Sequence, residues 1–392
     1  MVETVPGFDR IGEENAFTVL ARAGALAAEG RDIINLGIGQ PDFATPGHIV
    51  EASVKALRDG HHGYTDATGI LPLREAVAAD IHRRLGATVS PERVMIVPGG
   101  KVTMFAAILM FGAPGVEILF PDPGFPIYRS MIEFTGATPV PVPIREAHGF
   151  APDAAETLAL ITQKTRLLIL NSPANPTGGV MRPEAVAALA AGLADQPHVA
   201  VLADEIYGQM CHDGATHRSL LSFPDLYDRL IVLDGWSKTY AMTGWRLGYA
   251  VWPDALLDKA RKLAVNAWSC VNAPAQWGAK AALEGPQDCV AEMMAAFARR
   301  RGRVVSGLNA LPGVACRMPE GAFYAFPNVS ALGFPAKTLA TRLLEEAGVA
   351  LIGGPDFGAL GEGYLRLSYA NSEENIARAL DRMADWIAAH SA

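Results

Sequence analysis

The stretch LIVLDGWSKTYAMTGWRLGYAVW, residues 230–252, indicates both how the chain folds and where its chemistry lies. Residues 230–233 form a short apolar run that stops at an aspartate and a glycine, which is typical of a buried strand closing at a turn. Lys238 follows where strand ends of α/β proteins point into a ligand crevice. Arg246, eight residues later, can help the lysine to lose its proton and can hold a phosphate. We therefore predict an amine that forms a Schiff base, and the alternative is a surface lysine beside an ordinary loop.

The pattern S-K-x-x-x-M-x-G-x-R-x-G over residues 237–248 resembles the lysine signature of fold-type I pyridoxal-phosphate aminotransferases of class I and II, in particular the aspartate/aromatic group. The resemblance implies that Lys238 is the catalytic residue and binds pyridoxal 5'-phosphate as a Schiff base. It also implies that Ser237 and Arg246 hold the phosphate of this cofactor.

Five apolar runs predict an open α/β fold, with a mainly parallel sheet flanked by helices in a large domain. The runs stop at Pro98, Pro121, Asn171, Asp204 and Asp234. Because the carboxyl ends of parallel strands meet at one edge of a sheet, we expect these ends to build one site. The large, cofactor-binding domain is predicted at residues 48–285. Residues 1–47 and 286–392 are predicted to form a smaller α/β domain, with strands at 322–326 and 364–369.

The glycines that follow the first of these runs, at residues 94–97, suit a phosphate. Gly99, Gly100 and Lys101 lead from an apolar run into a helix, whose first N–H groups and positive dipole end attract anions. A plain tight turn would use the same glycines. Gly235 departs from the family, which often has serine there, so Ser237 or the backbone is expected to compensate.

The resemblance also implies which residues contact the cofactor ring and which residue reaches a second subunit. Asp204 would pair with the protonated ring nitrogen, because a buried carboxylate needs a partner, although a helix N-cap would also use it. Asn175, in the motif N-P-T-G, and Tyr207 would bind the ring hydroxyl. Phe125 would stack on the ring, and a purely structural proline-rich turn suits it equally. Tyr64 matches a tyrosine that reaches the phosphate of the other subunit, so a homodimer with shared active sites is expected.

Substrate binding is expected at an arginine on a strand of the smaller domain. Arg366 lies between two leucines in GYLRLSYA, and its forked guanidinium suits a carboxylate. The resemblance implies that it binds the substrate α-carboxylate, together with Asn175 and the backbone of Gly39. Phe17 and the uncharged helix around Leu109 predict an apolar wall, and hence a neutral or aromatic amino donor with 2-oxoglutarate or pyruvate as acceptor. Aspartate as donor stays open.

Other reactions and roles of the same scaffold stay as alternatives. An aspartate aminotransferase, a β-eliminating C–S lyase or a β-decarboxylase would keep the same site, because the cofactor can break different bonds of its substrate. A regulatory module of this fold would carry an N-terminal DNA-binding domain, and the roughly thirty residues before the family match are too few for one.

The composition narrows the partners and the compartment. With 392 residues, of which 50% are hydrophobic, the chain can bury a large core in two domains. A net charge of -8 and the absence of a long basic run argue against nucleic acid as a partner. No stretch reads as a signal peptide or a membrane span, and the four cysteines lack metal-ligand spacing. We therefore expect a cytoplasmic protein that contacts no membrane and binds no metal.

Overall fold

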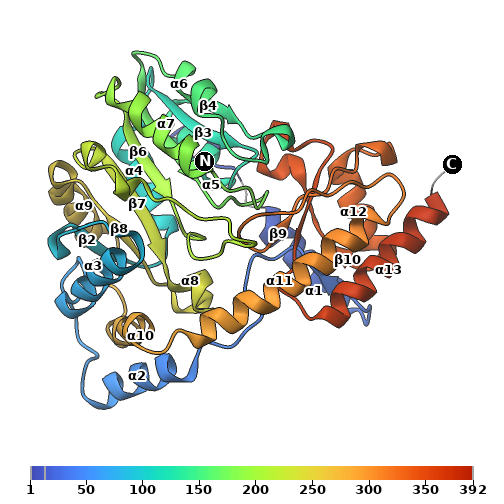
Figure 1. Ribbon diagram of the computed structural model, residues 1–392, viewed down its shortest axis with the longest axis horizontal. Coiled ribbons are helices and arrows are strands. Elements are labelled where there is room, and N and C mark those ends of the chain that lie inside the picture. Colours follow the sequence, from blue (N-terminus) through green and yellow to red (C-terminus); the bar gives the residue numbers. More distant parts are fainter. Residues whose placement is uncertain (1, 13–14, 391–392) are drawn as a thin grey trace.

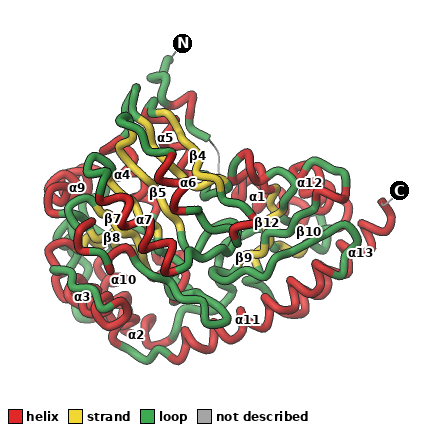
Figure 2. Tube along the Cα trace, turned by 45° about the horizontal axis from the view of Figure 1, so that its top comes forward, coloured by secondary structure: helices red, strands yellow, loops and turns green. Residues whose placement is uncertain are grey.

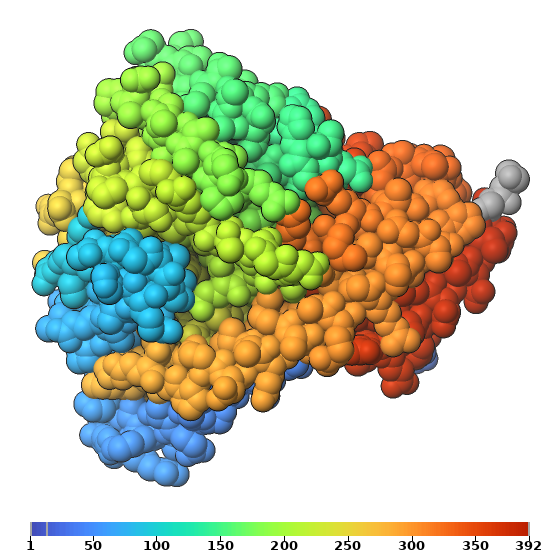
Figure 3. All heavy atoms as spheres, viewed as in Figure 1, coloured from blue at the N-terminus to red at the C-terminus, as the bar shows by residue number. Residues whose placement is uncertain are grey.

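A computed structural model describes residues 2–12 and 15–390 of the chain. In Figure 1 a large body built on a twisted sheet lies on the left, and a smaller body lies on the right. Helix α11 (Asp288–Asn309) runs from one body to the other. Figure 3 shows this helix as an orange ridge along the surface of the molecule.

The central sheet has seven strands in the order β2-β8-β7-β6-β5-β3-β4. Their bounds are β2 Val94–Val97, β3 Glu117–Asp122, β4 Thr138–Pro143, β5 Thr165–Asn171, β6 Ala200–Asp204, β7 Leu230–Gly235 and β8 Gly248–Val251. From β7 through β6, β5 and β3 to β4 the neighbours are parallel, whereas β8 is antiparallel to β7 and β2. The predicted mainly parallel sheet is confirmed.

Helices cover both faces of this sheet, as Figure 2 shows. One face packs on α4 (Lys101–Phe111), α5 (Ile127–Thr135) and α9 (Asp254–Ala267). The other packs on α3 (Leu71–Leu85), α7 (Pro183–Ala194) and α10 (Ala273–Glu284), with α2 (Gly47–Arg58) and α6 (Ala154–Ala159) farther out. Along β6, Ala200 and Leu202 face the first layer while Val201 and Ala203 face the second. Burial on both faces explains why the strands are continuous apolar runs rather than alternating ones.

The smaller body joins residues from the two ends of the chain. It holds a three-stranded antiparallel sheet and a two-stranded parallel one. Their strands are β1 Ile34–Asn35, β9 Tyr324–Ala325, β10 Val349–Ala350, β11 Ile352–Gly353 and β12 Leu365–Ser368. The helices are α1 Asn15–Ala28, α12 Ala336–Ala347 and α13 Glu373–His390, besides α11. Ile34 and Leu36 share a core with α11, α12 and α13, whereas the predicted boundaries at residues 48 and 285 stay a prediction.

The carboxyl ends of the parallel strands lie level at one edge of the central sheet. Asn171 at the end of β5 pairs with Asp204, and Asp204 pairs with Leu233 of β7. This register places the polar residues that follow the strands next to one another. Among the described helices, none is long and apolar enough to span a membrane.

Candidate active site

A cavity of about 530 Å³ opens at this edge, between the central sheet and the smaller body. Every site residue predicted from the sequence lines it except Gly99 and Tyr64. The residues concerned are Phe17, Gly39, Gly100, Lys101, Phe125, Asn175, Asp204, Tyr207, Ser237, Lys238, Arg246 and Arg366. Residues more than 300 positions apart in the sequence therefore meet in one space. Among the described residues, no group of three histidine, cysteine or acidic side chains is arranged to hold a metal ion.

Lys238 enters the cavity from a single helical turn directly after β7. This turn, α8 (Trp236–Thr239), starts where the strand ends, so the lysine lies within one turn of the sheet edge. The Nζ atom donates a hydrogen bond to the carbonyl oxygen of Gly39 at 2.5 Å. It also lies 5.8 Å from the ring centroid of Phe323. The amine is thus part-buried and held against the N-terminal segment that crosses the cavity.

The start of α4 and Arg246 together form a cradle for an anion. Gly100 precedes the helix, and no described side chain caps its first N–H groups or adds an acid to its first turn. Gly99 has a φ of +88°, and a Cβ atom there would lie 2.1 Å from Arg246 Nη2. The backbone at this position therefore favours glycine, and a larger residue would also displace the guanidinium of Arg246. The positive end of a helix beside a guanidinium suits a phosphate.

The departure at Gly235 has a packing reason. Gly235 pairs with Gly248 of the antiparallel strand β8, and a Cβ atom at Gly235 would lie 2.7 Å from Gly248 Cα. Two backbones this close leave no room for a serine side chain. Ser237 lines the cavity, and its predicted contact with a phosphate stays a prediction.

Asp204 is a buried carboxylate held by neutral donors. Its Oδ2 accepts a hydrogen bond from the Tyr128 hydroxyl at 2.6 Å, and its Oδ1 accepts one from the Ile206 N–H at 3.3 Å. Burial raises the pKa of Asp204 to about 6, and the charges of Asp234 and Glu205 act in the same direction. The chain after Asp204 forms a turn and not a helix, so the N-cap alternative is wrong.

Tyr128 was missed by the sequence reasoning. It is fully buried in the first turn of α5, and its ring meets Phe125 edge-on at 5.9 Å. The available signal was its position three residues after Phe125, because a turn at the start of the helix, in which the Tyr128 N–H bonds the Phe125 carbonyl oxygen at 3.1 Å, brings the two rings together.

The opposite end of the cavity is built around Arg366. This side chain is buried, and its Nη1 donates to Asn175 Oδ1 at 3.0 Å while its Nη2 donates to the Gly37 carbonyl oxygen. The neighbouring Leu365 and Leu367 point into the core of the smaller body, so the predicted alternation along the strand is confirmed. The guanidinium therefore reaches the cavity from a rigid strand.

Tyr207 lies between the two ends of the cavity. Its hydroxyl is 2.7 Å from the hydroxyl of Tyr324, and burial raises its pKa well above the ordinary value. Tyr324 also lines the cavity and was not identified from the sequence. A phenol pair of this kind stays protonated and can donate to an oxygen in the cavity.

The expected uncharged wall needs a correction. Leu109 does not line the cavity, because it lies eight residues along α4 from Lys101, about 12 Å farther by the rise of a helix. Lys101 does line it, and its Nζ lies 5.3 Å from the ring centroid of Phe17 and 5.2 Å from that of Phe125. The wall therefore combines two aromatic rings with one cation.

Tyr64 lies outside the cavity of its own chain. Its side chain is 94% exposed, in the loop before α3. A contact with a second subunit stays a prediction.

Known proteins are similar to this chain over most of its length. The model of the family "Aminotransferase class I and II" matches residues 31–383. An aspartate aminotransferase from Streptomyces avermitilis is 39% identical over 384 residues, which cover 95% of this chain and 93% of the relative. The crystal structure of the aspartate aminotransferase from Rhizobium meliloti has a TM-score of 0.93 at 33% identity and covers 99% of both chains.

A second solved structure, the aromatic aminotransferase from Pyrococcus horikoshii, has a TM-score of 0.88 at 35% identity and covers 94% of this chain and 99% of that one. These matches agree with the α/β fold described above. The chain therefore belongs to the class I and II aminotransferases, a family of pyridoxal-phosphate-dependent transaminases, and the predicted family, fold class and enzyme class are confirmed.

Proposed function

We propose that the enzyme binds pyridoxal 5'-phosphate in this cavity and moves an amino group from an L-amino acid to a 2-oxo acid, 2-oxoglutarate or pyruvate. The observation that carries the proposal is that Lys238, Asp204 and Arg366 line one cavity of about 530 Å³. They supply an amine, a buried carboxylate and a buried guanidinium, which are the three charged groups that this chemistry needs.

The cavity residues fit the cofactor from one end to the other. The N-terminus of α4 at Gly100, with Ser237 and Arg246, would hold the phosphate. Phe125 would cover the ring, and Asp204 would face its nitrogen. When bound, the cofactor supplies an electron sink for the substrate α-carbon.

The protein's own groups would then orient the substrate and move its proton. Arg366 holds the α-carboxylate by a bidentate contact, because a guanidinium matches a carboxylate in shape and charge. Asn175 already accepts a hydrogen bond from Arg366 Nη1 and keeps the guanidinium aimed into the cavity. Lys238 Nζ accepts the α-proton, and its contact with the Gly39 carbonyl oxygen is broken when it moves.

We propose an acidic donor, aspartate or glutamate, as the preferred substrate. Lys101 is the observation that favours it, because a cation in the cavity can bind the distal carboxylate. The rings of Phe17 and Phe125 on either side of Lys101 favour a second candidate, the neutral or aromatic donor expected from the sequence. Apolar walls discriminate weakly, so both classes can react at different rates.

A half-reaction screen tests both proposals. Purified enzyme is mixed with single amino acids, and the absorbance of the bound cofactor is followed before products are identified. Fast conversion by aspartate or glutamate supports the acidic donor, and fast conversion by phenylalanine or tyrosine alone contradicts it. Pyruvate or alanine that accumulates without an acceptor would instead indicate a C–S lyase or a β-decarboxylase.

Substitutions at Lys238 and Lys101 test the roles proposed for these two residues. Lys238→Ala should bind the cofactor but lose turnover by about 10⁴-fold or more, because it removes both the amine and the base. Lys101→Met should lose about tenfold or more with aspartate, as expected for one charged hydrogen bond, and keep its rate with phenylalanine. Lys101→Arg, which retains the charge, is the matched control. An unchanged aspartate rate in Lys101→Met would contradict the acidic donor.

The assembly and the compartment belong to the same proposal. Tyr64, exposed at 94% on a single chain, supports a homodimer in which it reaches the phosphate of the second subunit. Mixed dimers of Lys238→Ala and Tyr64→Phe chains would regain activity if sites are shared. The four cysteines are all free, which supports a reducing compartment such as the cytoplasm.

A further inference from the structure

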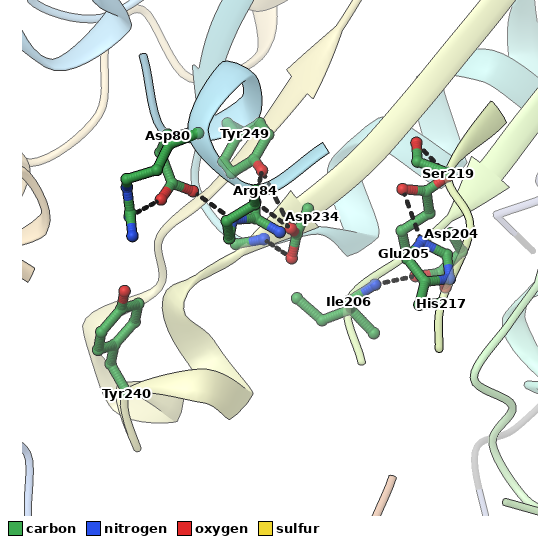
Figure 4. A network of polar contacts seen from close by, with 12 residues as sticks. Asp80, Arg84, Asp204, Glu205, Ile206, His217, Ser219, Asp234, Tyr240 and Tyr249 are labelled. Carbon is green, nitrogen blue, oxygen red and sulfur yellow. Dashed lines mark hydrogen bonds and ion pairs between the residues drawn. The ribbon is translucent and has the colours of Figure 1, made fainter. Parts of the chain in front are cut away.

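A buried ion pair lies outside the main cavity, next to Asp204. Glu205 follows it at the end of β6, and its Oε2 is 3.0 Å from Nε2 of His217, with each side chain 8% exposed. The Ser219 hydroxyl donates to Glu205 Oε1 at 2.9 Å. Figure 4 shows Glu205, His217 and Ser219 close to Asp204 on the right, and the cluster around Asp234 on the left. The pair takes no part in the site described above.

These groups share a low-dielectric environment. Asp204, Glu205 and His217 line one small cavity of about 20 Å³, whose other walls are mostly aliphatic. Charges that are screened little by water act strongly on each other, so the net charge of the pair matters to Asp204. Arg218 also lines this small cavity, and its guanidinium lies 4.6 Å from the ring centroid of Phe223.

The neighbouring strand adds a third carboxylate and its own cation. Asp234 accepts from the Tyr249 hydroxyl at 3.0 Å and lies 3.5 Å from Arg84 Nη2. Arg84 is bound in turn by Asp80 at 2.6 Å. Of the three carboxylates at these strand ends, Asp234 and Glu205 thus each face a basic side chain of the protein, whereas Asp204 faces the main cavity.

The directions of the pKa shifts agree with this arrangement. Burial alone would lower the pKa of His217, but the charge and hydrogen bond of Glu205 together with the charge of Asp234 outweigh it, and the pKa is raised above its ordinary value. For Asp204, burial raises the pKa, and the charges of Asp234 and Glu205 raise it further. A Glu205 carboxylate that lost its imidazolium partner would therefore make Asp204 bind its proton more tightly.

We propose that His217 is a positioning residue for the reaction: its imidazolium cancels the charge of Glu205, so that Asp204 keeps a negative charge for the ring nitrogen. The inference rests on the proposed function, in which Asp204 faces that nitrogen. It adds a requirement that the main cavity alone does not reveal, because His217 does not line that cavity.

The test compares two ligands that differ by one atom. Dissociation constants are measured for pyridoxal 5'-phosphate and for its 1-deaza analogue, in which a C–H replaces the ring nitrogen. The ratio of the two constants reports the contact with ionised Asp204, and loss of structure weakens both ligands equally. In the unsubstituted enzyme this ratio should change with pH, because Asp204 is ionised only above its pKa. The preference for the natural cofactor should disappear below the midpoint of that change. A wild-type enzyme with no preference at any pH would refute the proposed function itself.

Four variants then separate charge from packing. His217→Gln leaves Glu205 uncompensated and should move the midpoint up by about one pH unit. Glu205→Gln removes the charge that keeps the buried His217 protonated, so the imidazole becomes neutral, and the double variant Glu205→Gln/His217→Gln carries neither charge. Both should keep the wild-type midpoint. Ser219→Ala removes a hydrogen bond to Glu205 without changing charge and is the matched control. A preference retained with an unmoved midpoint in His217→Gln, or a midpoint that moves equally in the double variant, would overturn the inference.

A measurement on the unsubstituted protein does not depend on how the variants fold. The His217 imidazole resonance, assigned by its loss in His217→Gln, should titrate above the ordinary value of 6.5. Titration at or below that value would mean that the imidazole is neutral near pH 7, and the inference would fail.

Discussion

The ends of the neighbouring strands β6 and β7 carry two carboxylates in similar settings. Asp204 is 3% exposed and Asp234 is 6% exposed. Burial is the main cause that raises the pKa of each to about 6. Their strands are parallel and in register, so the two side chains leave the sheet at the same edge.

Their partners differ in charge. Asp234 lies beside Arg84 and accepts hydrogen bonds from Tyr249 and from the Gly235 N–H, whereas Asp204 accepts from Tyr128 and the Ile206 N–H and lines the cavity. A buried carboxylate with a cation from its own chain contributes to the fold. One that is held by neutral donors at the wall of a cavity is set up for a cation that arrives with a ligand.

The largest expected effect tests which carboxylate serves the reaction. Asp204→Asn keeps the shape and removes the charge, so transamination should fall about 10³-fold or more while the fold survives. Asp234→Asn is the matched substitution one strand away, and it should cost much less activity because Asp234 does not line the cavity. Steady-state rates and far-ultraviolet circular dichroism check both. Equal losses of activity in the two variants would contradict the view that Asp204 alone serves the reaction.

The second prediction concerns the cation of Asp234. Arg84→Met removes the guanidinium that pairs with the buried carboxylates of Asp80 and Asp234. It should lower the free energy of unfolding by about 3–5 kcal/mol. Arg83 also contacts Asp80, but its side chain is 55% exposed against 16% for Arg84. Arg83→Met should therefore cost less than about 1 kcal/mol. Urea unfolding of the cofactor-free proteins measures both free energies. Equal losses of stability in Arg84→Met and Arg83→Met would show that Asp234 does not depend on a buried cation.

The third prediction concerns how the protonation of Asp204 makes the stability of the fold depend on pH. Its pKa rises from 3.8 to about 6 on folding, so the folded state binds the proton more tightly than the unfolded state. Stability is therefore lost as the pH rises from about 4 to about 6, and the loss approaches about 3 kcal/mol. The cofactor-free Asp204→Asn protein should be more stable than the wild type above that window and equal to it below. Unfolding curves at several pH values measure this difference, and a less stable variant at neutral pH would contradict it.

Most of the fold and of the cavity wall follows from local sequence. The strand that ends before Lys238 and the strand at residues 94–97 were predicted with little error, because a strand buried on both faces is a continuous apolar run with a turn after it. Residues at the ends of two other parallel strands, Asn171 of β5 and Asp204 of β6, were brought together by the shared edge of the sheet.

Residues that contact the site from elsewhere could not be found in this way. Tyr324 reaches Tyr207 across 117 positions, and His217 reaches Glu205 from a loop that has no apolar pattern. The error at Leu109 had a similar origin, since only the direction of α4 decides which of its residues faces the cavity. Such contacts depend on how elements pack, and a single sequence does not specify that packing.

The smallest expected effect belongs to one of these missed residues, Tyr128. Its hydroxyl donates to Asp204 at 2.6 Å, and removing that bond in Tyr128→Phe should raise the pKa of Asp204. A hydrogen bond to a charged group contributes about 1.5–3 kcal/mol, so the shift is about one pH unit or more. Turnover should be close to wild type at alkaline pH, where Asp204 is ionised in both proteins, and roughly tenfold lower on the acid side.

Tyr227→Phe is the matched control for this variant, because the Tyr227 hydroxyl bonds the carbonyl oxygen of Leu221 at 2.6 Å, away from the cavity. The control should lose some stability and leave the pH profile of turnover in place. A uniform loss at every pH in Tyr128→Phe would mean that the hydroxyl only supports packing. A displaced acid limb, with the alkaline rate retained, would mean that the neutral donors of Asp204 set its charge, which is the property that separates it from Asp234.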